Sequence, residues 1–134
     1  MNSFSLKIVT PDGVKFDGQA EELVVRTISG DMGILAGHIN CVAPLGMGRA
    51  TIITDGRRRY AACIGGMVSV VNGKVKLVPT TFEWADSIDV VRAEASEAKA
   101  QTILKDKDSS ETDLRLAEAR LKRALIRKSV AAYK

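Results

Sequence analysis

The chain has 134 residues, of which 46% are apolar and 27% are charged, a composition that predicts a folded domain with a core. Its net charge is +4, and its aromatic content of 4% is too low for a base-stacking surface that binds single-stranded nucleic acid. No apolar run reaches the ~18 residues of a membrane-spanning helix, and MNSFSLKIVT lacks the features of a signal or transit peptide.

Residues 1–85 have the pattern of β-strands, with short runs rich in Val and Ile between turn residues. A first turn is expected at Thr10-Pro11-Asp12-Gly13, and hairpins at Asp55-Gly56 and Asn72-Gly73. Many short strands at this spacing indicate an antiparallel β-sandwich or flattened barrel. The expected strand runs are FSLKIV, VKF, ELVVRTI, GRATIIT, RRRYAACI, MVSVV and KVKLV.

Cys41 and Cys63 each lie in an apolar run, which predicts two buried free thiols. Two separate cysteines and one histidine do not have the spacing of a metal site, so we expect no metal.

The stretch GDMGILAGH (30–38) holds three glycines and the only histidine of the chain. It lacks the Gly-Lys-Ser/Thr ending of a P-loop and does not match G-x-G-x-x-G. No nucleophile or paired carboxylate accompanies His38 in the sequence, so a hydrolase built on this histidine is disfavoured. We interpret the stretch as a loop at a sheet corner, with contact to a partner as the second possibility.

Residues 86–134 change character, because glycine and proline disappear and alanine, leucine and charged residues dominate. Asp86 or Ser87 is the expected cap of a first helix that ends near Lys105. Ser110, followed by Asp113, is the expected cap of a second helix that loses definition near Val130. The chain is therefore predicted to be α+β, with a β-sandwich followed by an antiparallel helical hairpin.

The two helices carry little apolar bulk. The first has mainly alanines, and the second has one apolar face. Small residues let the helices approach closely, but their docking on the sandwich should be weak, with hinges near Asp86 and residues 106–110. The residues concerned are Ala93, Ala95, Ala98 and Ala100 in the first helix and Leu114, Ala117, Leu121, Ala124 and Leu125 in the second.

The two predicted helical regions differ in charge. Residues 86–113 hold four basic and eight acidic side chains, whereas residues 114–134 hold seven basic and one acidic. The basic end predicts attraction to an acidic partner, weakened by salt. A merely solvated basic face is the alternative interpretation.

Five stretches together resemble one family. GDMGILAGH is similar to the signature loop of the epsilon subunits of bacterial F-type rotary ATP synthases. The resemblance covers nearly the whole chain, although Ala36 and Ser69 replace a usual proline and a common acidic residue. Three stretches match in order and spacing, namely VTPDG, IGGMVSVVNGKVKLV and SIDVVRA, and the basic end LKRALIRKSV also fits.

The resemblance implies a non-catalytic subunit of the central stalk, which turns with the rotor and helps to couple proton translocation to ATP synthesis. Its sandwich would bind the gamma subunit and rest on the ring of c subunits. The protein would then lie at the cytoplasmic face of a bacterial membrane and meet that membrane only through the complex. Met32, Ile34 and His38 are implied to lie near gamma or the c-ring, with simple loop packing as the alternative.

The resemblance also implies a hairpin with two poses. In the extended pose, the basic helix would reach the catalytic beta and the alpha subunits and block ATP hydrolysis. The residues implied for this contact are Arg115, Arg120, Lys122, Arg123, Arg127 and Lys128.

Some members of this family bind ATP as a regulator in the compact pose, although no cofactor is required. Lys99 stands where ATP-binding members have a further arginine, and a lysine lacks the planar fork that grips phosphate. A local ion pair between Asp89 and Arg92 is the alternative for those two residues. The matching positions are Glu83, Asp89, Arg92, Ala93, Arg123 and Arg127.

A second functional hypothesis is an unrelated adaptor whose β-domain presents a basic helix to nucleic acid. The sequence has few residues suited to reading bases, and the family resemblance predicts no nucleic-acid partner. Co-purification with gamma would separate the two hypotheses.

Overall fold

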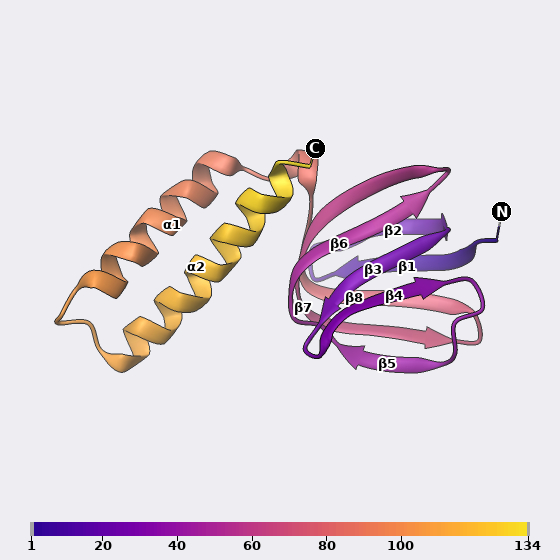
Figure 1. Cartoon of the computed structure of the whole chain (residues 1–134), viewed down its shortest axis with the longest axis horizontal. Coiled ribbons are helices and arrows are strands. Elements are labelled where there is room, and N and C mark those ends of the chain that lie inside the picture. Colours follow the sequence, from indigo (N-terminus) through magenta and orange to yellow (C-terminus); the bar gives the residue numbers. More distant parts are fainter. Residues whose placement is uncertain (1, 134) are drawn as a thin grey trace.

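The structure is a computed structural model that describes residues 2–133. Eight strands form one sheet folded into a sandwich, and two helices follow as an antiparallel hairpin (Figure 1), which confirms the predicted α+β fold. The strands are β1 (Phe4–Thr10), β2 (Gly13–Ala20), β3 (Glu22–Thr27), β4 (Gly30–Leu35), β5 (Cys41–Pro44), β6 (Met47–Thr54), β7 (Arg57–Val71) and β8 (Lys74–Trp84).

The sheet order is β2-β1-β8-β7-β6-β3-β4, and β5 pairs with β7 off this path. Only β1 and β8 run parallel among the pairings of the described chain. The two runs expected on either side of residues 65–66 are one strand, β7, which pairs with β6 up to Ile64 and with β5 from Met67. At Gly66 the φ is 98°, and a Cβ would lie 2.0 Å from the Val78 carbonyl oxygen. A side chain therefore has no room where β7 changes partners.

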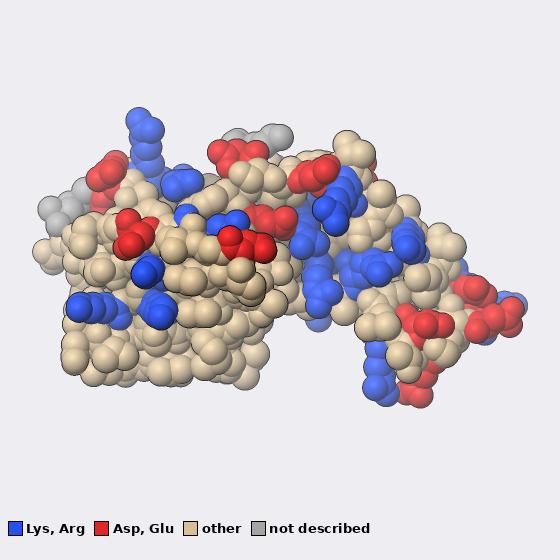
Figure 2. All heavy atoms as spheres, turned by 180° about the vertical axis from the view of Figure 1, so that it is seen from behind, with Lys and Arg blue, Asp and Glu red and all other residues tan. Residues whose placement is uncertain are grey.

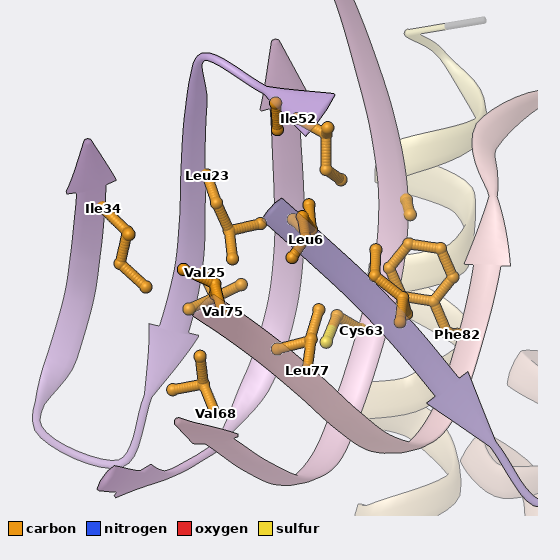
Figure 3. Packing of buried hydrophobic residues seen from close by; sticks show 14 of the residues in the cluster. Leu6, Leu23, Val25, Ile34, Ile52, Cys63, Val68, Val75, Leu77 and Phe82 are labelled. Atoms are coloured by element: carbon orange, nitrogen blue, oxygen red, sulfur yellow. The ribbon is translucent and has the colours of Figure 1, made fainter. Parts of the chain in front are cut away.

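The core lies between the two layers of the sandwich (Figure 3). Alternation along β1 buries Leu6 and Ile8 completely, as expected for a strand with one face toward a core. Both predicted hairpins are confirmed. Asp55 and Gly56 have φ of 52° and 74°, and the equivalent pair at residues 72–73 has 50° and 78°, the left-handed geometry that such two-residue turns need.

The stretch 30–38 is only partly a loop. Residues Gly30–Leu35 form β4, which pairs with β3 as a hairpin, so the expected corner loop is limited to residues 36–40. Gly30 and Gly37 have positive φ, of 121° and 84°, at the two ends of this strand. The glycines therefore serve the turns that flank a strand, and the strand itself was missed.

Cys63 is buried, and its burial raises the pKa of its thiol to about 12. Cys41 is only half-buried, which corrects the expectation of two buried thiols. The reason is its position on the short strand β5, where it packs against the edge of the core rather than within it.

The helices are α1 (Val90–Lys105) and α2 (Glu111–Ala131). The cap of α1 is Asp89, whose carboxylate accepts a hydrogen bond from the Arg92 amide at 3.0 Å, so the expected cap at 86 or 87 was wrong. Those residues lie instead in a 3-10 turn, η1 (Ala85–Ser87). The cap of α2 is Ser110, which forms a reciprocal capping box with Asp113, as predicted.

Four alanines form the seam between the helices, because Ala93, Ala100, Ala117 and Ala124 are each no more than 3% exposed. The small-residue contact is thus confirmed. Leu125 is 45% exposed, however, so the predicted apolar face of α2 was wrong at this position. The seam follows a seven-residue spacing, which turns residue 125 away from α1.

The hairpin meets the sandwich through the C-terminal end of α2 and the segment before α1, while the turn between the helices lies at the far end (Figure 1). This contact is small, because it is made mainly by short side chains. Its buried members are Ala62, Ala85, Ile88, Val130 and Ala131. Among the helices of residues 2–133, none is both long and apolar enough to cross a membrane.

Candidate functional site

A cavity of about 410 Å³ lies where the sandwich, the 3-10 turn and both helices come together. The end of β8 supplies Glu83, the first turns of α1 supply most of the other wall residues, and α2 closes the cavity. The lining residues are Glu83, Ser87, Asp89, Arg92, Ala93, Ser96 and Arg127.

Arg127 connects the helical hairpin to the β-sandwich at this cavity. Its Nε donates to the Glu83 carboxylate at 2.5 Å, and the two side chains are 28% and 35% exposed. Charge-assisted hydrogen bonds of this kind are roughly twice as strong as bonds between neutral groups. It ties α2 to β8 at a point where the apolar contact is small.

Arg127 also lines a second cavity of about 350 Å³. Ser96 lies in the walls of both cavities, so the two adjoin. The remaining walls of the second cavity come from β7, β8 and α2, namely Ile64, Gly65, Thr80, Thr81, Arg120 and Arg123.

The residues expected to bind ATP are mostly gathered here. Five of them line the first cavity, Arg123 lines the second, and Lys99 is exposed on α1 and lines neither. Asp89 contacts the backbone amide of Arg92. Within residues 2–133 the ion pairs do not include one between these two side chains, so the alternative of a local ion pair is wrong.

Ser87, Ser96 and Arg120 complete the cavities, and the sequence did not point to them as members of this site. Ser96 follows Arg92 by four residues, so helical spacing could have placed both on one face. Arg120 precedes Arg123 by three residues on α2, so the same spacing could have placed these two on one face, whereas the strand β8 that faces them is distant in sequence.

The three residues expected near gamma or the c-ring differ in how far their side chains are buried. Ile34 is fully buried and points into the sandwich (Figure 3), which agrees with the alternative of packing, and its nearness to a partner stays a prediction. Met32 is half-buried against the core. His38 is also half-buried, and its Nδ1 lies 2.8 Å from the Ile39 carbonyl oxygen.

The exposed apolar side chains at this end of the sandwich are neighbours of the expected residues. Leu35 is 57% exposed, Ile39 is 77% exposed and Val42 is 64% exposed. The alternation of strand β4 would have indicated that Leu35 faces outward if residues 30–35 had been recognised as a strand.

The basic side chains of α2 that were expected to contact the beta subunit differ in the ion pairs that they form within the chain. Arg115 pairs with Glu111 at 3.0 Å on the exposed surface, and Lys128 pairs with Glu97 of α1 at 2.8 Å. The hydrogen bond to Glu97 raises the pKa of Lys128. Figure 2 shows Lys and Arg gathered on the hairpin near its junction with the sandwich. Arg120, Lys122 and Arg123 are exposed.

No cluster of three or more His, Cys, Asp or Glu side chains that could hold a metal ion is found in residues 2–133.

Two family models match consecutive parts of the chain. The β-sandwich domain of the ATP synthase delta/epsilon chain matches residues 3–85, and its long α-helix domain matches residues 86–132. The chain belongs to the delta/epsilon chain family of ATP synthases. The predicted resemblance is therefore confirmed, and family membership favours the first functional hypothesis over the nucleic-acid adaptor.

Relatives of this ATP synthase family match along almost their full length. The chain is 43% identical to the ATP synthase epsilon chain of Ruminococcus albus over 132 residues, 98% of each chain. It is also 43% identical to the ATP synthase epsilon chain of Bacillus velezensis over 131 residues, again 98% of each.

The same fold occurs in solved ATP synthases. A chain of the Euglena gracilis mitochondrial enzyme, in a structure of OSCP, F1 and c-ring, aligns with a TM-score of 0.83 at 21% identity. The alignment covers 100% of this chain and 83% of that one. A chain of the Tetrahymena thermophila mitochondrial central stalk and c-ring aligns with a TM-score of 0.60 at 14% identity, covering 95% of each.

Proposed function

We propose that the chain acts as a non-catalytic rotor subunit of an F-type ATP synthase, in which the sandwich binds gamma and the c-ring. The observation that carries this proposal is the match to both domains of the family, with relatives named ATP synthase epsilon chain covered over 98% of their length. The subunit would sit at the cytoplasmic face of a bacterial membrane. The exposed apolar side chains at residues 35, 39 and 42 supply a surface suited to protein contact.

Inhibition of ATP hydrolysis by the hairpin is the second part of the proposal. The small apolar contact and the single ion pair at Arg127 make the compact pose separable from the sandwich without exposing a large core. Once released, α2 would offer its basic side chains to acidic loops of beta. Opposite charge favours such an encounter, and salt weakens it.

The test is ATP hydrolysis by F1 reconstituted with the full-length chain. Replacing Arg123, Arg127 and Lys128 with glutamine should raise hydrolysis, because the extended helix loses its attraction to beta. A matched control replaces three exposed sandwich lysines with glutamine, for an equal change in charge, and should leave hydrolysis unchanged. Hydrolysis that does not respond to the α2 variant would contradict the inhibitory role. The control lysines are Lys7, Lys74 and Lys76.

Regulation by ATP is the third part. The first cavity combines Arg92 and Arg127 with the carboxylates of Glu83 and Asp89, so it offers donors for phosphate and acceptors for the sugar or base. A ligand that binds only the compact pose stabilises that pose.

Thermal unfolding of the full chain with Mg-free ATP tests this regulation. At a concentration about 100 times the dissociation constant, the compact pose would gain roughly 2.7 kcal/mol, and the melting temperature should rise. Arg92→Gln should reduce that rise. An unchanged melting temperature at millimolar ATP would refute ATP binding.

A further inference from the structure

One outer face of the sandwich gathers three exposed lysines. It belongs to the part of the sheet formed by β2, β1, β8, the end of β7 and β5. Alternation turns Lys7 of β1 and Lys74 and Lys76 of β8 outward, whereas Leu6 and Leu77 face the core. Lys7 and Lys76 are register partners in the parallel pairing, and Lys74 lies two residues before Lys76. The three lysines are therefore neighbours, and we call this surface the lysine face.

Apolar side chains are exposed on the lysine face beside the lysines. Met67 is the register partner of Val78, and Val71 is the register partner of Lys74. Val14 lies on the same face at the outer strand β2. These four side chains are 42%, 41%, 51% and 58% exposed, in the order in which Met67, Val78, Val71 and Val14 are named here. The face therefore combines positive charge with apolar area.

The charge of the lysine face is not neutralised by ion pairs. Among the pairs that the structure describes for residues 2–133, no carboxylate lies within 4.0 Å of the ammonium groups of Lys7, Lys74 or Lys76. Asp17 is the register partner of Lys7 on β2, and counting it against the three lysines leaves two positive charges unbalanced. An acidic surface would supply the missing negative charge.

The composition of this face favours lipid headgroups over a protein as that acidic surface. Protein interfaces are enriched in aromatic residues and arginine and are depleted of lysine. The exposed residues of the lysine face, within the described chain, include neither an aromatic residue nor an arginine. Lysine stems can lie along apolar area while their ammonium groups reach anionic headgroups. Such headgroups attract each lysine near the surface by about fivefold in affinity.

We propose that the lysine face docks the free chain on anionic phospholipid headgroups. This goes beyond the rotor role proposed above and beyond the expectation that the chain meets the membrane only through the complex. A chain held at the bilayer surface before assembly is concentrated where a membrane-embedded c-ring would receive it. Binding should be reversible, because three lysines and a flat apolar area give a weak surface contact.

The basic helix α2 is the rival surface for such binding. Its Arg127 and Lys128 are engaged in ion pairs with Glu83 and Glu97. The lysine face has no such pairs to break within the described residues, so it is available without a change of pose. The two surfaces can be separated by variants with an equal change in charge.

The test is co-sedimentation of the full-length chain with vesicles. One preparation holds equal parts of phosphatidylcholine and phosphatidylglycerol, and the other holds phosphatidylcholine alone. The chain should bind the anionic vesicles at low salt and release them at about 1 M salt, where the Debye length is ~3 Å. Replacing Lys7, Lys74 and Lys76 together with glutamine should lower the partition coefficient by about 100-fold. Lys76→Gln alone should lower it by about fivefold.

Two control variants accompany the triple glutamine variant. Replacing the exposed Arg120, Lys122 and Arg123 of α2 with glutamine removes the same charge from the rival surface and should change the partition coefficient less than about threefold. Replacing the three lysines of the lysine face with arginine keeps the charge and should preserve binding, which a merely structural role of the lysines would not require. Circular dichroism verifies that each variant is folded.

Four outcomes would overturn the proposal. The unmodified chain may fail to bind the anionic vesicles at low salt, or it may bind phosphatidylcholine vesicles equally well. Binding may instead persist in the lysine variant and be lost in the α2 variant, which would assign it to the hairpin. Finally, a lysine variant that keeps vesicle binding but no longer co-purifies with gamma would make this face a protein interface.

Discussion

Replacing Tyr133 with alanine should loosen the end of α2 from the sandwich. The Tyr133 ring lies 4.8 Å from the Tyr60 ring of β7, centroid to centroid, at an interplanar angle of 42°. The Arg49 guanidinium of β6 lies 4.4 Å from the first centroid and 5.2 Å from the second. These three side chains form a clamp beside the small apolar contact of the hairpin.

The magnitude follows from the area that the clamp buries. Tyr133 is 47% exposed, so about half of a side-chain area of roughly 200 Å² is removed from water. At ~25 cal/mol per Å², this gives ~2.5 kcal/mol as an upper limit, from which ordering the side chain subtracts about 1 kcal/mol. A net loss of roughly 1–2 kcal/mol lowers the ratio of docked to undocked hairpin about 5- to 30-fold.

Hydrogen exchange of the amides in the last two turns of α2 measures this change directly. Tyr133→Ala should speed their exchange, and Arg49→Gln should do so to a smaller extent. Tyr133→Phe keeps the ring contact and should exchange at nearly the original rate. Leu116→Ala truncates a side chain of α2 that is 65% exposed and serves as the control. Equal exchange in Tyr133→Ala and the unmodified chain would refute the clamp.

Two further predictions concern the sandwich. Gly66→Ala places a Cβ against the Val78 carbonyl oxygen at a positive φ, so urea unfolding should show a loss of at least about 2 kcal/mol, whereas Gly33→Ala, with open space around its Cβ, should cost less. Burial raises the thiol pKa of Cys63 to about 12 in the folded chain, against an ordinary value of 9.0. Its contribution to stability is therefore complete below pH 9 and falls between pH 9 and 12 by roughly 1.4 kcal/mol per pH unit. Unfolding of Cys63→Val should lack this component, and an identical pH dependence would contradict the assigned burial.

Features set by neighbouring residues were predictable from the sequence. The hairpins at Asp55-Gly56 and Asn72-Gly73 and the capping box of Ser110 and Asp113 depend on dihedral angles and hydrogen bonds within four residues. The cap of α1 was missed because three candidate caps lie within residues 86–89, and only the docking of Ala85 and Ile88 selects Asp89.

The candidate site was predictable only in part. The SIDVVRA stretch led to Asp89, Arg92 and Ala93 through a family resemblance, and the first cavity does contain them. The partnership of Arg120 with Thr80 and Thr81 depends on how α2 crosses β8, a relation between residues some 40 positions apart that periodicity does not encode. The inward orientation of Ile34 was not predicted, because glycines on both sides hid a strand whose alternation turns this residue toward the core.

The attachment of the hairpin at one end gives it the mechanical character of a lever. The chain enters the hairpin at the start of α1, and the end of α2 docks on the sandwich beside it (Figure 1). The covalent connection and the non-covalent contact of the hairpin therefore lie side by side. The 21 residues of α2 make an arm about 30 Å long, so a rotation of 10° at the pivot would carry the far turn about 5 Å. Separating the short apolar side chains, the ion pair of Arg127 with Glu83 and the Tyr133 clamp at this one junction would therefore free the far end of the hairpin to move.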